Sequence, residues 1–145
     1  MEKFIPHVIE SSLCVVLTFL AVLCSADSVY EIEGEKRTVL RFHPRVAPIK
    51  VGIFPLVKNK PALVDRAVEI YKKMQKRWNV IYDQSGAIGR RYRRIDEAGV
   101  PFGVTVDFET IEGDGTVTVR NRDTTEQERF KVEEAIHMID NEINP

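Results

Sequence analysis

Four arginines fall within five consecutive positions in the second half of the chain, namely Arg90, Arg91, Arg93 and Arg94. The guanidinium group is planar and carries a fork of hydrogen-bond donors, which suits phosphate oxygens and the edges of bases. A cluster of such groups beside a sheet can therefore bind a polynucleotide backbone. The alternative is a solvated helix face, because Arg93 and Glu97 are four residues apart and could pair in water. Both interpretations stay open on the pattern alone.

The segment from Ser85 to Gly99 must position these arginines, and its apolar residues predict how. Ile88, Tyr92 and Ile95 recur at intervals of four and three residues, which places them on one face of a helix. Three of the arginines then project from the opposite face, and Arg91 lies at the border. The sequence therefore predicts a helix with one apolar face and one basic face.

The composition limits the kind of protein this can be. A chain of 145 residues with 43% hydrophobic content can bury one core, so we expect one main domain. The formal net charge of -1 excludes a protein that coats nucleic acid indiscriminately, because that class is strongly basic as a whole. Any binding of nucleic acid must therefore depend on a local basic surface. The tail from Asp107 onward is rich in Asp and Glu, and we expect it to face away from a nucleic acid.

An apolar run from Leu13 to Leu23 resembles the hydrophobic region of a signal peptide, with Ala26 where cleavage could follow. A single lysine, Lys3, stands where a stronger positive charge is usual, so we expect a cytoplasmic protein and keep export as the alternative. The run is shorter than the roughly 20 residues of a membrane span, and no membrane partner is expected. The competing prediction is a strand from Phe4 to Ile9 followed by an apolar helix that needs another protein layer over it.

The only two cysteines, Cys14 and Cys24, lie in or beside this apolar run. Neither has a neighbouring cysteine or histidine at the spacing of metal ligands. They predict buried free thiols, and we expect neither a disulfide framework nor a metal site.

The middle of the chain predicts a strand, a helix and a second strand. The continuous apolar run from Val51 to Leu56 is typical of a strand covered on both faces. Pro61 suits the first turn of a helix whose apolar positions continue to Trp78, and residues 79–82 offer the next strand. This order implies parallel pairing through a right-handed crossover. Upstream, residues 30–45 predict a turn followed by a strand or an extended connector.

The C-terminal third predicts further strands and a closing helix. Alternation over residues 101–108 and 116–120 indicates an antiparallel hairpin with its turn at residues 112–115. Thr125 and Glu128 have the spacing of a capping box, which predicts that the last helix begins there. The sequence therefore indicates an α/β fold with a mixed sheet.

Several of these stretches together resemble the anticodon-binding domain at the C-terminal end of glycyl-tRNA synthetase, a class II aminoacyl-tRNA synthetase. They are residues 51–56, 85–99, 102–107 and 117–127. The resemblance implies an α/β domain over residues 50–145, with a mixed sheet of about five strands and flanking helices. Residues 1–49 are then a remnant of the strand and helix of synthetase motif 3, followed by a connector. The resemblance also implies RNA binding, in particular of tRNA through its anticodon, in protein biosynthesis.

The resemblance implies that side chains from the helix and from the hairpin meet RNA. The four arginines are the candidates on the helix, while Arg120, Arg122, Asp123 and Gln127 are the candidates that could meet base edges. Phe102 is a further candidate as a stacking platform. Each also has a structural alternative: Arg122 and Asp123 could pair with each other, and Phe102 could belong to the core.

Upstream, residues 4–10 are similar to motif 3 of the same synthetase, and Glu10 and Ser12 match residues that recognise glycine. Where that family has a proline, a glycine and an arginine that contacts ATP, this chain has Ser11, Cys14 and Leu17. A neutral leucine cannot reproduce the contact of an arginine with a nucleotide. We therefore expect no catalytic residue and no cofactor; ATP and magnesium are implied only for a complete synthetase, whose motifs 1 and 2 would precede this segment.

Three functions are compatible with the resemblance. The preferred one is a truncated or stand-alone module that binds tRNA, in particular glycine tRNA, without aminoacylation activity of its own. The second is the C-terminal part of an active glycine–tRNA ligase that a catalytic partner completes in trans. The third is a protein-interaction or regulatory subunit, in which the apolar helix at residues 13–23 binds a partner or a second copy.

Overall fold

The computed structural model describes residue 5, residues 7–32 and residues 35–145. The helices in these residues are α1 (Val15–Ala26), α2 (Pro61–Met74), α3 (Ile88–Glu97), α4 (Phe108–Glu112) and α5 (Val132–Ile143). The strands are β1 (Asp27–Ile32), β2 (Glu35–Leu40), β3 (Val51–Pro55), β4 (Val80–Tyr82), β5 (Phe102–Val106), β6 (Thr116–Asn121) and β7 (Gln127–Lys131).

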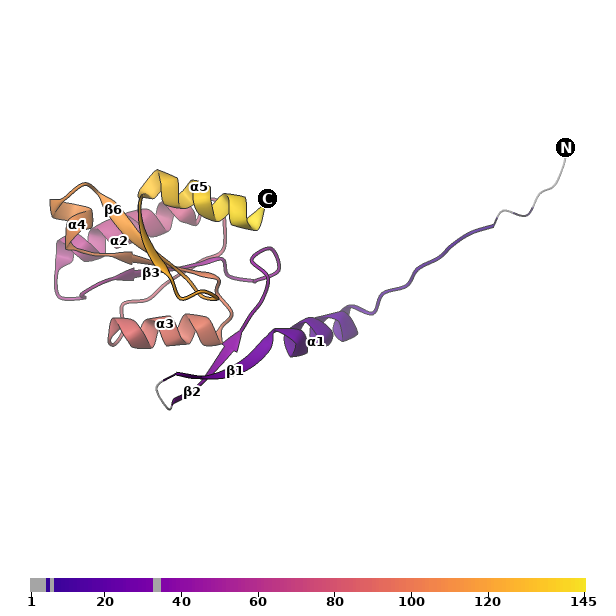
Figure 1. Ribbon diagram of the computed structural model, residues 1–145. Coiled ribbons are helices and arrows are strands. Elements are labelled where there is room, and N and C mark those ends of the chain that lie inside the picture. The colour runs from indigo at the N-terminus through magenta and orange to yellow at the C-terminus, as the bar shows by residue number, and fades with distance from the viewer. Residues whose placement is uncertain (1–4, 6, 33–34) are drawn as a thin grey trace, which may run out of the picture.

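Five of these strands form one mixed sheet in the order β4-β3-β5-β6-β7. Strand β3 is parallel to β4 and β5, whereas β6 is antiparallel to β5 and β7. Figure 1 shows α2 and α5 on one face of the sheet and α3 on the other. The predicted α/β fold with a five-stranded mixed sheet is confirmed, and so is the parallel crossover through α2.

The main core lies between the sheet and helices α2 and α5. The apolar positions of α2 recur every three or four residues, and Leu63, Ala67, Ile70 and Met74 are all buried against the sheet. Each of the three larger side chains, Leu63, Ile70 and Met74, contributes about 1.5–3 kcal/mol through this burial. A smaller cluster of Phe54, Ile95 and Val100 fills the opposite face, under α3. The core therefore fixes α3 on a different face from the other two long helices of the domain.

Two glycines allow α3 to lie close to the sheet. Gly52 on β3 and Gly103 on β5 are partners in the strand register. A Cβ atom at Gly103 would lie 2.6 Å from Cε1 of Tyr92, and one at Gly52 would lie 3.1 Å from Cγ2 of Ile95. The hydroxyl of Tyr92 also shares a hydrogen bond of 2.6 Å with that of Thr105. The Tyr92 and Ile95 side chains of α3 thus rest directly on the strand backbone, because the strands carry no side chain at these two positions.

The C-terminal end of α3 is closed by Gly99, which has a φ of +76°. Its N–H donates to the Asp96 carbonyl at 3.1 Å, and the Val100 N–H donates to the Ile95 carbonyl at 2.9 Å. This pair of hydrogen bonds is the Schellman pattern, in which a left-handed residue suits glycine. A Cβ atom at Gly99 would lie 2.8 Å from Cε2 of Phe42, so the position is also crowded.

The start of the last helix was not correctly predicted by the capping-box spacing. Thr125 has a φ of 61° in the β6–β7 turn, Glu128 lies within β7, and α5 begins only at Val132. The observed helix start is marked by Glu134, whose carboxylate accepts from the Lys131 N–H at 3.1 Å. Strand β7 is mostly exposed at the edge of the sheet, so its residues carry no apolar alternation that could indicate a strand.

The antiparallel pairing of β5 with β6 is confirmed, but their connection contains the short helix α4 in addition to the predicted turn. Asp107 caps this helix: its carboxylate accepts from the Thr110 N–H at 3.2 Å, and the Thr110 hydroxyl accepts from the Asp107 N–H at 3.1 Å. Phe108, which was expected on the strand, begins α4 and is 41% exposed.

The N-terminal part contains α1 and a hairpin of β1 and β2. The predicted apolar helix is present as α1, and most of its large apolar side chains are exposed. Residues 30–45, predicted as a turn followed by a strand or an extended connector, contain the strand β2, while β1 was not predicted. Of the strand expected over Phe4–Ile9, residues 4 and 6 lie outside the described residues, and residues 5 and 7–9 form no strand.

The two cysteines are free, but both are exposed, so the prediction of buried thiols is wrong. The reason is that α1 has no second layer packed over its outer face in the described part of the chain. None of the described helices is long and apolar enough to cross a membrane.

Candidate nucleic-acid interface

Helix α3 places three of the predicted arginines at the surface. Arg90, Arg93 and Arg94 are exposed, and Ile95 is buried beneath them. Nε of Arg93 donates to Oε1 of Glu97 at 3.3 Å, the pair expected of a solvated helix face. The side chain of Arg90 makes no hydrogen bond or ion pair with another residue that the structure describes. Arg90 is therefore the most available cation of the cluster.

Arg94 is tied to the loop that precedes α3. Its Nε donates to Oδ2 of Asp83 at 3.0 Å, and its Nη2 donates to the Ser85 carbonyl at 2.7 Å. Partial burial by itself would raise the pKa of Asp83, but hydrogen bonds from Ser85 and Arg94 outweigh it and lower that pKa below its ordinary value. Asp83 is therefore ionised at neutral pH and offsets part of the charge of Arg94, whose side chain remains 44% exposed.

Arg91 does not lie at the border of the helix, because it is only 2% exposed. Its guanidinium donates to the carbonyl of Pro55 at the end of β3 and, at 2.7 Å, to the carbonyl of Gly86. Both of these acceptors are backbone oxygens inside the domain. Arg91 thus joins the end of a central strand to the loop before α3.

Arg120 is also buried, and it faces α3 from strand β6. Its Nη1 and Nη2 donate to the two carboxylate oxygens of Asp96 at 2.9 and 3.1 Å. The guanidinium carbon lies 4.9 Å from the centre of the Tyr92 ring, a cation–π distance. Burial raises the pKa of Tyr92. Arg120 and Asp96 therefore form a bidentate link between β6 and α3.

Arg122 holds three segments together at the end of β6. Its Nη1 donates to the Gly99 carbonyl at 2.9 Å, and its Nη2 donates to the Phe42 carbonyl at 2.8 Å. Its Nε also donates to Asp123 at 3.0 Å, so the pairing given as the structural alternative is present. Asp123 is exposed in the turn, and Gln127 is exposed at the start of β7. Of the four residues predicted to meet base edges, Asp123 and Gln127 therefore have accessible side chains, whereas Arg120 and Arg122 are buried.

A groove of about 440 Å³ lies beside the exposed face of α3. Four arginines and a single aspartate are among the side chains that line it: Arg37, Arg90, Arg93, Arg120 and Asp96. Because Asp96 is engaged by Arg120, the charge that the groove presents to solvent is positive. An electropositive groove of this kind attracts phosphate groups.

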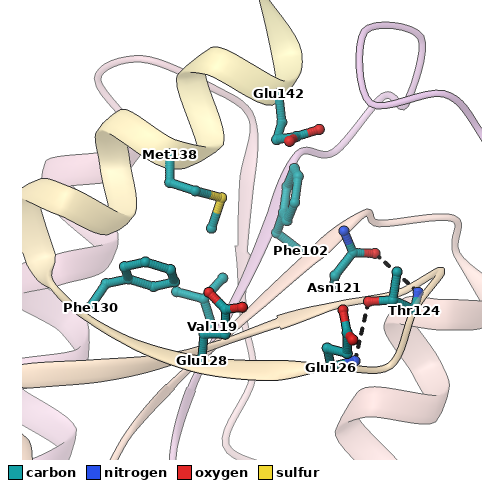
Figure 2. Close-up of a pocket in the computed structure, with 9 residues that line it drawn as sticks. All are labelled: Phe102, Val119, Asn121, Thr124, Glu126, Glu128, Phe130, Met138 and Glu142. Atoms are coloured by element: carbon teal, nitrogen blue, oxygen red, sulfur yellow. Dashed lines mark hydrogen bonds between the residues drawn. The ribbon is translucent and has the colours of Figure 1, made fainter.

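A second hollow, of about 230 Å³, lies on the other face of the sheet, under α5. Figure 2 shows Phe102, Phe130 and Met138 around its apolar part and Glu126, Glu128 and Glu142 as its carboxylates. Phe102 is 2% exposed, so it is a core residue at the base of this hollow and not an open stacking platform. The carboxylates would repel phosphate, but they can accept hydrogen bonds from amino groups.

Strand β6 separates the two hollows. Val119 and Asn121 line the acidic hollow, whereas Arg120 between them lines the basic groove. Successive residues of a strand point to opposite faces, so the two hollows lie on opposite sides of this end of β6. The arrangement places guanidinium cations on one face of the sheet and carboxylate hydrogen-bond acceptors on the other.

Glu10 and Ser12 lie apart from this region. Both are exposed in the segment before α1, which forms no helix or strand. Figure 1 shows this segment extending away from the sheet and from α3. The structure thus does not bring these two residues together with the arginines.

Two residues of the groove, Arg37 and Asp96, were not predicted from the sequence. Asp96 lies four positions after Tyr92 on the buried side of α3, and this spacing was a usable signal. A carboxylate on an apolar helix face needs a cation partner, because burying an unpaired charge is costly. Arg37 lies two residues before the buried Val39 on the same face of β2, but the hairpin itself was not predicted.

These features define a compact α/β domain with a basic helix against a mixed sheet. The sequence profile of the family described as the anticodon binding domain matches residues 50–142. That match covers more than half of the chain, and the chain belongs to this family.

The individual relatives are proteins named glycine–tRNA ligase. The one from Lachnoclostridium phytofermentans is 51% identical over 134 residues, which are 92% of this chain and 28% of the relative. The one from Lachnospira eligens is 52% identical over 132 residues, or 90% and 28%. The one from Borrelia garinii subsp. bavariensis is 48% identical over 143 residues, or 98% and 32%. The resemblance to glycyl-tRNA synthetase is confirmed, and the chain spans less than a third of the length of these relatives.

Proposed function

We propose that this chain is a tRNA-binding module that contacts the anticodon loop and has no aminoacylation activity of its own. The observation that carries the proposal is the exposed arginine face of α3 in a domain of the anticodon-binding family. The names of the relatives favour glycine tRNA as the partner. The proposal includes a cytoplasmic location and assigns no cofactor, since ATP and magnesium belong to a complete synthetase.

The two hollows suit two parts of an RNA loop. Arg90 and Arg93 beside the basic groove would contact phosphates, which position the RNA. Glu126 and Glu128 in the acidic hollow would accept hydrogen bonds from the amino groups of an unstacked base. Gln127 lies between those two glutamates in the sequence, and its amide can both donate and accept. A loop that crosses the end of β6 would reach both faces of the sheet.

The candidate arginines divide into two groups under this proposal. Those with exposed guanidiniums would contact RNA directly: Arg90, Arg93 and Arg94. Those with buried guanidiniums act as positioning residues that hold α3, β6 and the adjoining loops in place: Arg91, Arg120 and Arg122. The difference follows from burial, because a buried guanidinium that is held by internal acceptors is closed off from a phosphate in solvent.

Charge reversal on α3 is the test of the proposed function. Arg90→Glu and Arg94→Glu are each expected to weaken binding of glycine tRNA by about tenfold or more, because a phosphate contact becomes a repulsion. Filter retention with labelled tRNA at fixed salt gives the measurement. Circular dichroism confirms that the variants keep the fold, which matters most for Arg94 because it is bonded to Asp83.

Arg66→Glu is the matched control, because Arg66 is partly exposed on α2, on the opposite face of the sheet, and forms an ion pair with Glu69 at 2.6 Å. It changes the net charge by the same amount, so binding should weaken by less than about twofold, as expected for a distant charge screened by salt. Equal affinity of the α3 variants and the control would refute the proposed function.

A second candidate function, binding of a protein partner, is favoured by the exposed apolar surface of α1. Val15, Val16, Leu17 and Phe19 on this helix are 65–77% exposed. Exposed apolar surface of this extent marks an interface or a tendency to aggregate. The partner would be a synthetase catalytic chain, which would make this chain part of a ligase, or a second copy of this chain.

Light scattering over a concentration series tests this second candidate. If α1 associates with a second copy, the apparent mass should rise with concentration, and Leu17→Glu with Phe19→Glu should restore the monomer mass. A mass equal to one chain at every concentration would exclude self-association through α1.

Glycine-dependent exchange between ATP and pyrophosphate by the isolated chain is not expected, and its detection would overturn the non-catalytic proposal.

A further inference from the structure

The basic groove has two walls, and one of them lies outside the matched domain. The family profile begins at residue 50, whereas Arg37 comes from β2 of the N-terminal hairpin. The other wall is α3, with Arg90 and Arg93. Figure 1 shows the hairpin running beside α3 on the side away from the sheet. The hairpin is attached to the domain beyond the C-terminal end of α3, where the Phe42 carbonyl just after β2 accepts from Arg122.

The alternation of β2 aims Arg37 at this groove. Val39, two residues further on, is 2% exposed, so Arg37 and Val39 share the hairpin face that packs on the domain. Lys36 and Thr38 point the other way and are exposed. The Nε of Arg37 is buried and has no hydrogen-bond partner among the described residues. A buried guanidinium donor without an acceptor is costly, and a shift of the Arg37 side chain toward an anion in the groove would relieve that cost.

The groove is suited to an anion by its remaining charges as well. Arg90, on the opposite wall, has no ion pair with a described residue. Among the described residues that line the groove, the one carboxylate is Asp96, and it is held by both Nη atoms of Arg120. Two arginines from separate elements therefore line one space in which none of the described lining residues offers an unpaired carboxylate. A phosphodiester group between them would receive charge-assisted hydrogen bonds from both sides.

We propose that Arg37 of the N-terminal hairpin, together with Arg90 of α3, binds one backbone phosphate of the RNA in this groove. The inference rests on the proposed function and deepens it, because it adds a residue outside the anticodon-binding family match to the RNA-binding surface. The hairpin then acts as a clamp on the RNA strand that runs along α3. The contact reads no base, since phosphate contacts position an RNA without specifying its sequence.

The test uses the full chain and glycine tRNA, with Arg37→Ala, Arg90→Ala and the double variant. Each single variant is expected to weaken binding by about fivefold and to reduce the slope of log affinity against log salt by about 0.7–0.9, the value for one lost phosphate contact. Because both arginines contact the same phosphate, the double variant should lose less than the product of the two single losses. Thermal unfolding of each variant shows that the fold is kept.

Lys36→Ala is the matched control, because it removes one positive charge from the adjacent residue on the other face of β2. It should change neither the salt slope nor, by more than about twofold, the affinity. If Arg37→Ala behaves like Lys36→Ala while Arg90→Ala still weakens binding, the inference is wrong and the proposed function stands. If none of the arginine variants changes the affinity, the proposed function itself fails.

Discussion

Replacing Asp96 by alanine is expected to lower the free energy of unfolding by about 3–5 kcal/mol, the usual cost of removing one partner of a buried ion pair. Asp96 is 3% exposed and Arg120 is 7% exposed. Without the carboxylate, the Arg120 guanidinium is left buried with no counter-charge under α3. Urea unfolding followed by circular dichroism measures the loss.

Two further variants separate the buried charge from other effects. Glu97→Ala, at the next position, removes only a surface pair with Arg93 and should cost about 0–1 kcal/mol. The double variant Asp96→Ala with Arg120→Met removes both charges and should recover much of the loss, because an apolar pair can replace a buried ion pair. A loss below about 1 kcal/mol for Asp96→Ala would show that the link between β6 and α3 does not support the fold in this way.

Replacing Gly99 by alanine is expected to lower the free energy of unfolding by about 2–5 kcal/mol. The loss has two sources, the left-handed backbone conformation and the overpacking of the added methyl group. Its φ is +76°, and an added Cβ atom would lie 2.8 Å from Cε2 of Phe42 and 3.1 Å from Cβ of Leu40. The contact would push the hairpin away from the end of α3. Calorimetric or optical thermal unfolding detects the change.

Gly115→Ala is the control for the backbone part of this effect. Gly115 has a φ of +75°, almost that of Gly99, but a Cβ atom there would meet nothing within 4 Å. Its replacement should lower the free energy of unfolding by about 1–2 kcal/mol, which is the penalty of the left-handed conformation alone. If the two variants lose equal stability, the contact of Gly99 with Phe42 makes no measurable contribution.

The sequence predicted those elements whose buried faces have a clear period. The stripe of α2 from Leu63 to Met74, the continuous run of β3 and the apolar face of α3 all follow from hydrophobic spacing. It failed at β7, which is polar because it lies exposed at the sheet edge. There the spacing of Thr125 and Glu128 imitated a helix start. Local patterns cannot show which polar segment pairs with a sheet, because the pairing depends on strands distant in sequence.

The arginines show in the same way that local sequence patterns cannot reveal contacts between distant segments. All candidate arginines have the same chemistry in the sequence, and their number indicated a basic surface. The structure divides them by the acceptors that the fold brings near, such as Asp96 for Arg120 and the Phe42 carbonyl for Arg122. These acceptors are 24 and 80 residues away along the chain. Spacing alone could therefore predict the presence of guanidiniums but not which of them remain free for a ligand.

The pair of glycines under α3 has a consequence for how the basic surface can vary among sequences. Because Gly52 and Gly103 carry no side chain, the height of α3 above the sheet is set by its inward side chains Tyr92 and Ile95, which rest on the strand backbone. The outward residues of α3 take no part in this contact. The helix can therefore exchange its outward residues freely while their distance from the β6–β7 turn stays constant. A fixed spacing of this kind is what a surface needs to fit a polymer whose own repeat distance does not change.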